Sequence, residues 1–229
     1  ARYQGRKPDG RVPMLTQPFI NPADTKTYSF IPPDEGTYWY HSHHISHEQV
    51  ARGMMEPLIV EDETPPDVDG DITVLMSDWQ MREDGSLTDA FTDMHSVAHG
   101  GYLGNFARAF LSQNQVKMGD RVRLRLINAA THRIFSTQVS GVRGSLVALD
   151  GMALSEPRPM TELVLAPAQR ADLIVDIIGP VAFDMVTRQE PYRLVDLAVS
   201  GTNADRQAEP SRALSSPNLP TPAAPPASI

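Results

Sequence analysis

Two histidines one residue apart, His41 and His43, are the residues of this sequence best suited to metal chemistry. They end an aromatic, β-favouring run that reads GTYWYHSH. In a strand, side chains two residues apart lie on the same face, and their Cα atoms are roughly 6.6 Å apart. Both imidazoles can therefore face one pocket, while Ser42 points the other way. Imidazole is a ligand of copper, zinc, iron and nickel, so the pair predicts a metal site. The alternative is a pair of partly buried rings satisfied by backbone hydrogen bonds.

Whether His47 can share a metal with His43 depends on where a possible helix after the pair begins. His43 and His47 are four residues apart, so they would face each other within one helix. The run SHEQ has the form of a capping box in which Gln49 reaches back to Ser46, and Gly53 would end the helix about two turns later. We therefore expect the helix to begin after His43, which disfavours a metal shared by His43 and His47.

The remaining histidines are weaker candidates for metal ligands, although the i, i+4 spacing of His95 and His99 is one that a metal site can use. His44 is out of phase with the pair, which favours a solvated position or a hydrogen bond to a ligand. His95 and His99 are four residues apart in a Gly-rich loop, DMHSVAHGGYLGN, without a carboxylate partner pattern. His132 follows NAAT at a strand end and is interpreted as structural. We therefore predict no further metal ligand, and no catalytic or organic-cofactor-binding residue.

Composition excludes several other kinds of chemistry. The chain of 229 residues has no cysteine, which excludes disulfides, thiolate ligands and cysteine nucleophiles within it. A formal net charge of -8 with interspersed signs argues against a nucleic-acid partner. No apolar run approaches the roughly 18 residues that a membrane span needs, and no signal peptide is recognisable. Phosphate-binding glycine loops and the Gly-x-Ser-x-Gly elbow are also missing.

The elements that position the pair are expected to be strands, because short alternating runs are separated by Gly, Pro and Asp. In the first part of the chain we expect strands over Thr25–Ile31, Thr37–His43 and Leu58–Glu61. A turn containing two prolines separates the first two. The polar, Pro-rich connection DETPPDVDGD then predicts a domain boundary.

The second part of the chain also predicts strands. RVRLRL, at Arg121–Leu126, alternates cleanly, so we expect its arginines on a solvent-facing side of an antiparallel sheet. Leu146–Leu154 carries Asp150-Gly151 between two apolar runs, which is a strong hairpin signal. Further strands are expected over Ile72–Met76, Leu163–Leu165, Ala171–Ile178 and Tyr192–Val199. The end of the chain is rich in Pro, Ala and Ser and predicts a linker.

Taken together, these segments resemble the multicopper oxidases, the laccase-like enzymes. GTYWYHSH, followed by EQVARG and PLIVED, closely resembles the second copper-binding segment of that family, and DGRVPMLTQPFINP resembles the segment that leads into it. LMSDWQ, HGGYLGN, RVRLRLINAA, ALDGM and LVLAPAQRADLIVDI resemble pieces of the family's middle domain, in the same order. The chain departs from the family at His47, where Gln is common, and at Glu56, where a small residue is usual.

The resemblance implies an all-β fold of two cupredoxin-like Greek-key β-sandwich or barrel units, the first incomplete, with a Pro-rich C-terminal linker. Residues 1–63 would be the C-terminal part of the first unit. Residues 64–185 would be a second unit without its own copper site, and residues 186–229 a linker toward a missing third domain. The resemblance also implies that His41 and His43 ligate the type 3 copper pair of a trinuclear cluster, one on each ion.

The activity that the resemblance implies is that of an oxidoreductase. A small reducing substrate, phenol-like or a metal ion, would give electrons singly to a type 1 copper, and dioxygen would be reduced to water at the cluster. A type 1 site needs a cysteine ligand, which this chain lacks, and seven histidines are too few for the whole set. We expect the chain to be inactive by itself and to require a C-terminal cupredoxin domain. The family also implies a periplasmic or secreted location.

Two alternatives to the oxidase remain open at this point. The chain could be a non-catalytic copper-binding or scaffold module, because two ligands leave most of the coordination sphere to water. It could also be a zinc-dependent hydrolase, since HSHHISH superficially resembles the H-x-H-x-D-H segment of metallo-β-lactamase-like enzymes. Against the hydrolase, Ile45 and Ser46 stand where that segment has its Asp, and the α/β alternation of that fold is absent.

Overall fold

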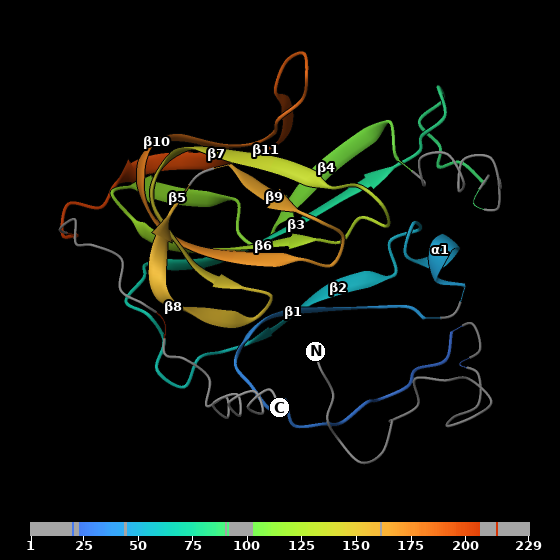
Figure 1. Cartoon of the computed structure of the whole chain (residues 1–229), viewed down its shortest axis with the longest axis horizontal. Coiled ribbons are helices and arrows are strands. Elements are labelled where there is room, and N and C mark those ends of the chain that lie inside the picture. Colours follow the sequence, from blue (N-terminus) through green and yellow to red (C-terminus); the bar gives the residue numbers. More distant parts are fainter. Residues whose placement is uncertain are drawn as a thin grey trace, which may run out of the picture.

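The computed structural model describes residues 20, 23–43, 45–89, 91, 103–160, 162–206 and 214. These residues form two sheets and one short helix (Figure 1). The smaller sheet contains β1 (Gly36–His41) and β2 (Met55–Val60), which are antiparallel and are joined through α1 (Ser46–Gln49). The larger sheet contains β3 (Gly70–Trp79), β4 (Phe106–Leu111), β5 (Gln115–Met118), β6 (Arg121–Asn128), β7 (Phe135–Leu149), β8 (Met152–Pro159), β9 (Leu163–Leu165), β10 (Arg170–Met185) and β11 (Tyr192–Thr202). The predicted all-β class is confirmed.

The larger sheet provides the main core of the chain. Its strands follow the order β4-β3-β6-β10-β11-β5, and β7 pairs with β10, β8 and β9. β6 lies between β3, to which it is parallel, and β10, to which it is antiparallel. Figure 1 shows this sheet curling over on itself, with β1 and β2 beneath it. Leu124, Leu173 and Phe183 are among the fully buried side chains of its interior.

The predicted hairpin at Asp150-Gly151 is confirmed. β7 and β8 pair up to Leu149 and Met152, and the two residues between them have φ angles of 52° and 80°. A type I′ turn requires positive φ at both central positions, and it matches the twist of the paired strands. The turn also contacts the smaller sheet, because a Cβ on Gly151 would lie 2.9 Å from an atom of the Tyr38 ring.

Replacing Gly151 by alanine is expected to cost more than the backbone strain alone. Gly85 has the same φ of 80° but nothing within 4 Å of the place of a Cβ, so Gly85→Ala is the matched control. We expect the control to lower the free energy of unfolding by about 1 kcal/mol, and Gly151→Ala by about twice as much, because Tyr38 must also move. Urea denaturation measures both variants, and equal losses would contradict the contact.

The face of β6 that carries arginines differs most from expectation. The alternation of RVRLRL predicts arginines in solvent, but Arg123 and Arg125 each keep only 1% of their surface exposed, and Arg121 keeps 6%. The prediction is wrong because β1 covers this face, as shown by the hydrogen bond between Arg125 and Thr37. Aspartates of β3 and β10, together with Asp62 in the connection after β2, meet the arginines there, so burial leaves no guanidinium of this row without a carboxylate.

The strand predicted over Thr25–Ile31 is also wrong. Residues 24–32 adopt no regular secondary structure, and Ile31 is 91% exposed. An alternating sequence forms a strand only when a neighbouring strand accepts its backbone hydrogen bonds. None of the described strands pairs with this segment.

The helix after β1 is shorter than the two turns predicted. α1 contains four residues, and hydrogen-bonded turns continue from it to Gly53, whose φ of 93° ends the run as predicted. Nothing helical in the described ranges has the length and apolar character needed to cross a membrane.

The strand predicted over Tyr192–Val199 is confirmed within β11. β11 pairs antiparallel with β10 and parallel with β5. The larger sheet therefore continues to Thr202, beyond residue 185, at which the predicted second unit ends.

Candidate metal centre

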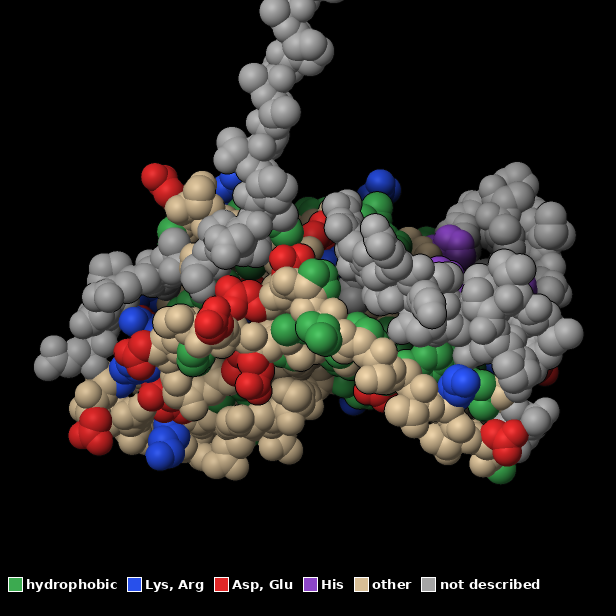
Figure 2. Space-filling view, turned by 90° about the horizontal axis from the view of Figure 1, so that it is seen from below, with side chains coloured by type: hydrophobic (Ala, Val, Ile, Leu, Met, Phe, Trp, Pro, Cys, Tyr) green, Lys and Arg blue, Asp and Glu red, His purple; other side chains and the backbone are tan. Residues whose placement is uncertain are grey.

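His41 and His43 lie side by side at the end of β1, as their spacing predicts. Their ring centroids are 4.6 Å apart, and the ring planes differ by 23°. The Trp39 ring stacks on His41 with the same centroid distance and 29° between planes. Residues 39, 41 and 43 therefore share one face, although β1 itself ends at His41. His41 is half-buried and His43 is exposed, and Figure 2 shows histidine side chains gathered at one end of the molecule.

Ser42, between the two histidines, makes hydrogen bonds through its backbone amide, its hydroxyl and its carbonyl. Its amide donates a hydrogen bond to the Met54 carbonyl at 3.1 Å, and its hydroxyl donates to Oε1 of Gln49. Its carbonyl oxygen lies 2.9 Å from Nδ1 of His41. A carbonyl can only accept, so Nδ1 must carry the proton, and Nε2 of the neutral ring then keeps the lone pair for a metal.

The inner end of the ring stack packs on the larger sheet. Trp39 contacts a buried cluster formed by Val50, Met55, Ile127 and Ala129, together with Leu75 and Trp79. Val50 and Met55 belong to the smaller unit, while the others come from β3, β6 and the residue after β6. The two units therefore share one apolar cluster directly behind the histidines, which fixes the position of β1.

A buried ionic network lies farther back along β1. The Thr37 hydroxyl donates to Oδ2 of Asp172 at 2.9 Å and accepts from Nη1 of Arg125 at 2.9 Å. Asp172 is 1% exposed, and its Oδ2 also accepts from Arg123 at 2.7 Å. The network thus binds β1 to β6 and β10 by hydrogen bonds to charged groups, which are stronger than those between neutral groups.

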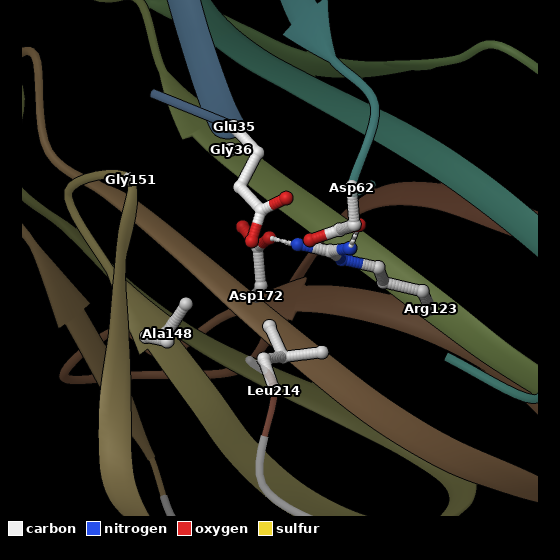
Figure 3. A pocket seen from close by; sticks show the side chains of 9 residues that line it. Glu35, Gly36, Asp62, Arg123, Ala148, Gly151, Asp172 and Leu214 are labelled. Carbon is white, nitrogen blue, oxygen red and sulfur yellow. Dashed lines mark hydrogen bonds and ion pairs between the residues drawn. The ribbon is translucent and has the colours of Figure 1, made fainter. Parts of the chain in front are cut away.

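Each arginine of the network also has a second carboxylate. Arg123 pairs with Asp62, which follows β2, and Figure 3 shows its guanidinium between Asp62 and Asp172. Arg125 makes a two-pronged contact with Asp71, at 2.6 and 2.7 Å. Burial acts to lower the pKa of Arg125, but the hydrogen bond to Asp71 and the charges of Asp172, Asp71 and Asp62 outweigh it and raise the pKa. Arg125 therefore stays charged.

The space beside this network is too small for a substrate. A cavity of about 10 Å³ is lined by Glu35, Gly36, Asp62, Arg123, Ala148, Gly151, Ala153, Asp172 and Leu214 (Figure 3). That volume corresponds to about one water molecule. The neighbouring Tyr38 phenol is neutral at ordinary pH, since burial and the charge of Asp34 raise its pKa. We therefore interpret this region as a junction between the two units, without a reaction of its own.

The structure places the other histidines away from the pair or does not describe them. His47 and His132 are exposed, and the His132 ring lies against the Thr131 hydroxyl at 3.1 Å. His44, His95 and His99 lie outside the described residues. Within the described ranges, no group of three or more His, Asp or Glu side chains could hold a metal ion. Among the described residues, His41 and His43 are therefore the candidate pair of metal ligands.

Comparison with known families identifies the family of the chain. Two sequence profiles described as multicopper oxidase match the chain, one over residues 3–65 and one over residues 70–202. The chain belongs to the multicopper oxidase family. The histidine pair lies in the first matched range, and the buried arginines of this multicopper oxidase chain lie in the second. Its fold is accordingly two cupredoxin-like units, of which the first has a sheet of only two described strands.

Curated relatives of this multicopper oxidase chain are about twice its length or longer. Multicopper oxidase MmcO of Mycobacterium tuberculosis is 28% identical over 233 residues, covering 88% of this chain and 45% of the relative. Laccase-1 of Fomitopsis schrenkii is 31% identical over 178 residues, covering 73% of this chain and 32% of the relative. The chain thus spans less than half of either relative.

Solved multicopper oxidases have the same fold. The crystal structure of Lac15 from a marine microbial metagenome is 46% identical, with a TM-score of 0.81, and the match covers 93% of this chain and 54% of that one. The multicopper oxidase of Pseudomonas thermotolerans is 26% identical with a TM-score of 0.78, over 93% of this chain and 52% of that one. Nearly all of this chain therefore superposes on about half of a multicopper oxidase.

Proposed function

We propose that this multicopper oxidase chain forms one part of an enzyme that couples one-electron oxidation of a reducing substrate to the reduction of dioxygen to water. In that enzyme, His41 and His43 would each ligate one ion of a type 3 copper pair within a trinuclear cluster. The observation that supports this most is the ring stack. An imidazole lone pair lies in the ring plane, so nearly parallel rings 4.6 Å apart favour separate ions over chelation of one.

The chain's own residues would hold and orient the two ligands. Bound copper would supply the one-electron chemistry. Trp39 covers the inner face of His41 and keeps water from that side of the ring. Ser42 holds the ring proton on Nδ1, which leaves Nε2 as the donor atom. Thr37 and the network behind it keep β1 fixed on the larger sheet.

The remaining ligands would come from other parts of the enzyme. This sequence has no cysteine, and a type 1 site requires one. We propose that residues 1–63 are part of the first cupredoxin-like unit and that the second unit begins at residue 64. Because β11 belongs to the larger sheet, the second unit continues to Thr202 instead of ending at residue 185, and we propose that the residues after it lead toward a third, C-terminal domain. Without that domain, the chain is expected to have no oxidase activity.

The names of the relatives support a proposal for the substrate and the location. Several are named laccases, and one is the iron transport multicopper oxidase fio1 of Schizosaccharomyces pombe, 29% identical over 172 residues. We propose a small phenol-like compound or a metal ion as the reducing substrate, with dioxygen as the oxidant. A periplasmic or secreted location agrees with such substrates.

A non-catalytic copper-binding module is the second candidate for the chain by itself. The observation that favours it is the limited ligand set of the described residues, which brings together only two imidazoles. The family assignment argues against the zinc-dependent hydrolase.

A chimaera tests the proposed function. Lac15 matches this chain over 54% of its own length, so the chain can replace that part of Lac15 while the rest is kept. We expect the copper-loaded chimaera to consume dioxygen in the presence of a phenolic dye, and the chain alone to consume none. An inactive chimaera that contains its full copper complement would favour the non-catalytic module. Dye oxidation by the isolated chain would contradict the proposal that the chain needs ligands from other parts of the enzyme.

A further inference from the structure

Gln49 occupies the centre of the loop that joins β1 to β2. Its backbone amide donates a hydrogen bond to the Ile45 carbonyl at 2.9 Å, and its backbone carbonyl accepts one from the Met54 amide at 3.0 Å. Met54 in turn accepts from the Ser42 amide at 3.1 Å. The backbone of Gln49 is therefore tied to both ends of the loop, independently of what its side chain does.

The side chain of Gln49 is directed back toward the histidine pair. The predicted capping box would direct it to Ser46, but its Oε1 accepts a hydrogen bond from the Ser42 hydroxyl. The Ser42 carbonyl, on the same residue, is the group that contacts Nδ1 of His41 at 2.9 Å. A chain of two hydrogen bonds thus runs from Gln49 through Ser42 to His41.

We propose that Gln49 is a positioning residue for the metal ligand His41, an inference that rests on the proposed function of the pair. By holding the Ser42 side chain, Gln49 keeps the Ser42 carbonyl turned toward Nδ1 of His41. That contact sets the tautomer with the proton on Nδ1, so that Nε2 is the atom presented to copper. Hydrogen bonds to the non-ligating nitrogen commonly fix the tautomer and orientation of a metal-binding histidine.

The neighbouring residues separate this role from a structural one. Val50 is 6% exposed and packs in the shared apolar cluster, so it holds the loop on the larger sheet. Glu48, next to Gln49, pairs only at the surface with Arg52, at 2.8 Å, in the described contacts. Substituting the Gln49 side chain therefore leaves the backbone hydrogen bonds and the Val50 contact in place. Glu48→Gln is the control, because it changes a side chain of the same helix that has no described contact with Ser42 or His41.

The tautomer of His41 can be measured without any metal. Long-range ¹H–¹⁵N correlation spectra of the histidine-labelled chain, well above the usual histidine pKa, report which ring nitrogen carries the proton. We expect Nδ1–H in the wild type and in Glu48→Gln, and a mixture of tautomers in Gln49→Leu. Gln49→Glu keeps an oxygen that accepts from Ser42, so it should restore the wild-type signal. Ser42→Ala removes the same bond from the other side and replaces Gln49→Leu if that variant does not fold.

Copper affinity gives the second readout. In competition titrations with a chromophoric chelator, Gln49→Leu should bind copper about tenfold more weakly than the wild type, and Gln49→Glu should recover most of the loss. A wild-type His41 that carries its proton on Nε2, or a Gln49→Leu variant with unchanged tautomer and affinity, would overturn the proposal. If the tautomer responds as expected but neither the wild type nor any variant binds copper, Gln49 still positions His41 and the proposed function is what fails.

Discussion

Alanine at His41 or at His43 is expected to remove most of the copper binding of this chain. Each ring is one of two imidazoles in the stack, and the described residues bring no third ligand to it. Changing a group that only hydrogen-bonds to a metal ligand typically costs 10- to 100-fold in metal affinity, so losing a ligand should cost at least about 100-fold. Equilibrium dialysis against copper measures the effect.

The matched control for this prediction is His132→Ala. His132 is exposed, and its ring lies against Thr131 rather than against the stack. We expect His132→Ala to bind copper as the wild type does, and the double variant of His41 and His43 to bind no more than background. Undiminished binding by that double variant would show that copper is held elsewhere on the chain.

Replacing Asp172 by alanine is expected to destabilise the whole chain by about 3–5 kcal/mol. The reason is that Asp172 is 1% exposed and bonded to both Arg123 and Arg125, which are equally buried. Removing the carboxylate leaves two almost fully buried guanidinium groups with less compensation for their charge. Chemical denaturation monitored by tryptophan fluorescence measures the loss.

Asp196→Ala is the surface control for Asp172. Asp196 pairs with Arg193, and the two side chains are 67% and 49% exposed. Exposed pairs of this kind contribute about 0–1 kcal/mol, so the control should unfold almost as the wild type does. If Asp172→Ala also cost less than about 1 kcal/mol, the buried network would not be what joins β1 to the larger sheet.

The local features of this fold are the ones that the sequence predicts well. The same-face placement of His41 and His43 needs only the two-residue period of a strand. The Asp150-Gly151 turn needs only two residues that accept positive φ, and Gly53 ends the α1 segment for a similar reason. Each of these features is decided by neighbours in the sequence, so pattern alone is enough.

The features that the sequence does not predict depend on distant partners. RVRLRL has the alternation of a strand with one wet face, and nothing within it shows that β1 will cover that face. The signal lies on another strand, since Asp172 and Asp176 fall opposite Arg125 and Arg121 in the register of β10 on β6. Opposite charges at paired positions indicate ion pairs across strands, but the register has to be known first.

Thr25–Ile31 is a segment for which the distant partner is missing among the described strands. Its alternation is that of a strand, yet no described strand pairs with it, and the segment stays irregular. Gln49 shows a similar limit at the candidate site, because the capping-box pattern is local whereas its contact with Ser42 depends on how the loop folds back.

The small sheet of β1 and β2 has a thermodynamic consequence. Two strands alone are marginally stable in water, so the ordered form of the histidine pair exists only while the larger sheet is folded. Metal occupancy and global unfolding are then linked quantities: copper at 100 times its dissociation constant would add about 2.7 kcal/mol to the stability of the entire chain. Conversely, a mutation deep in β7 or β10 that raises the unfolded population weakens apparent copper affinity without touching a ligand. The melting temperature of this chain would therefore report the loading of its histidines.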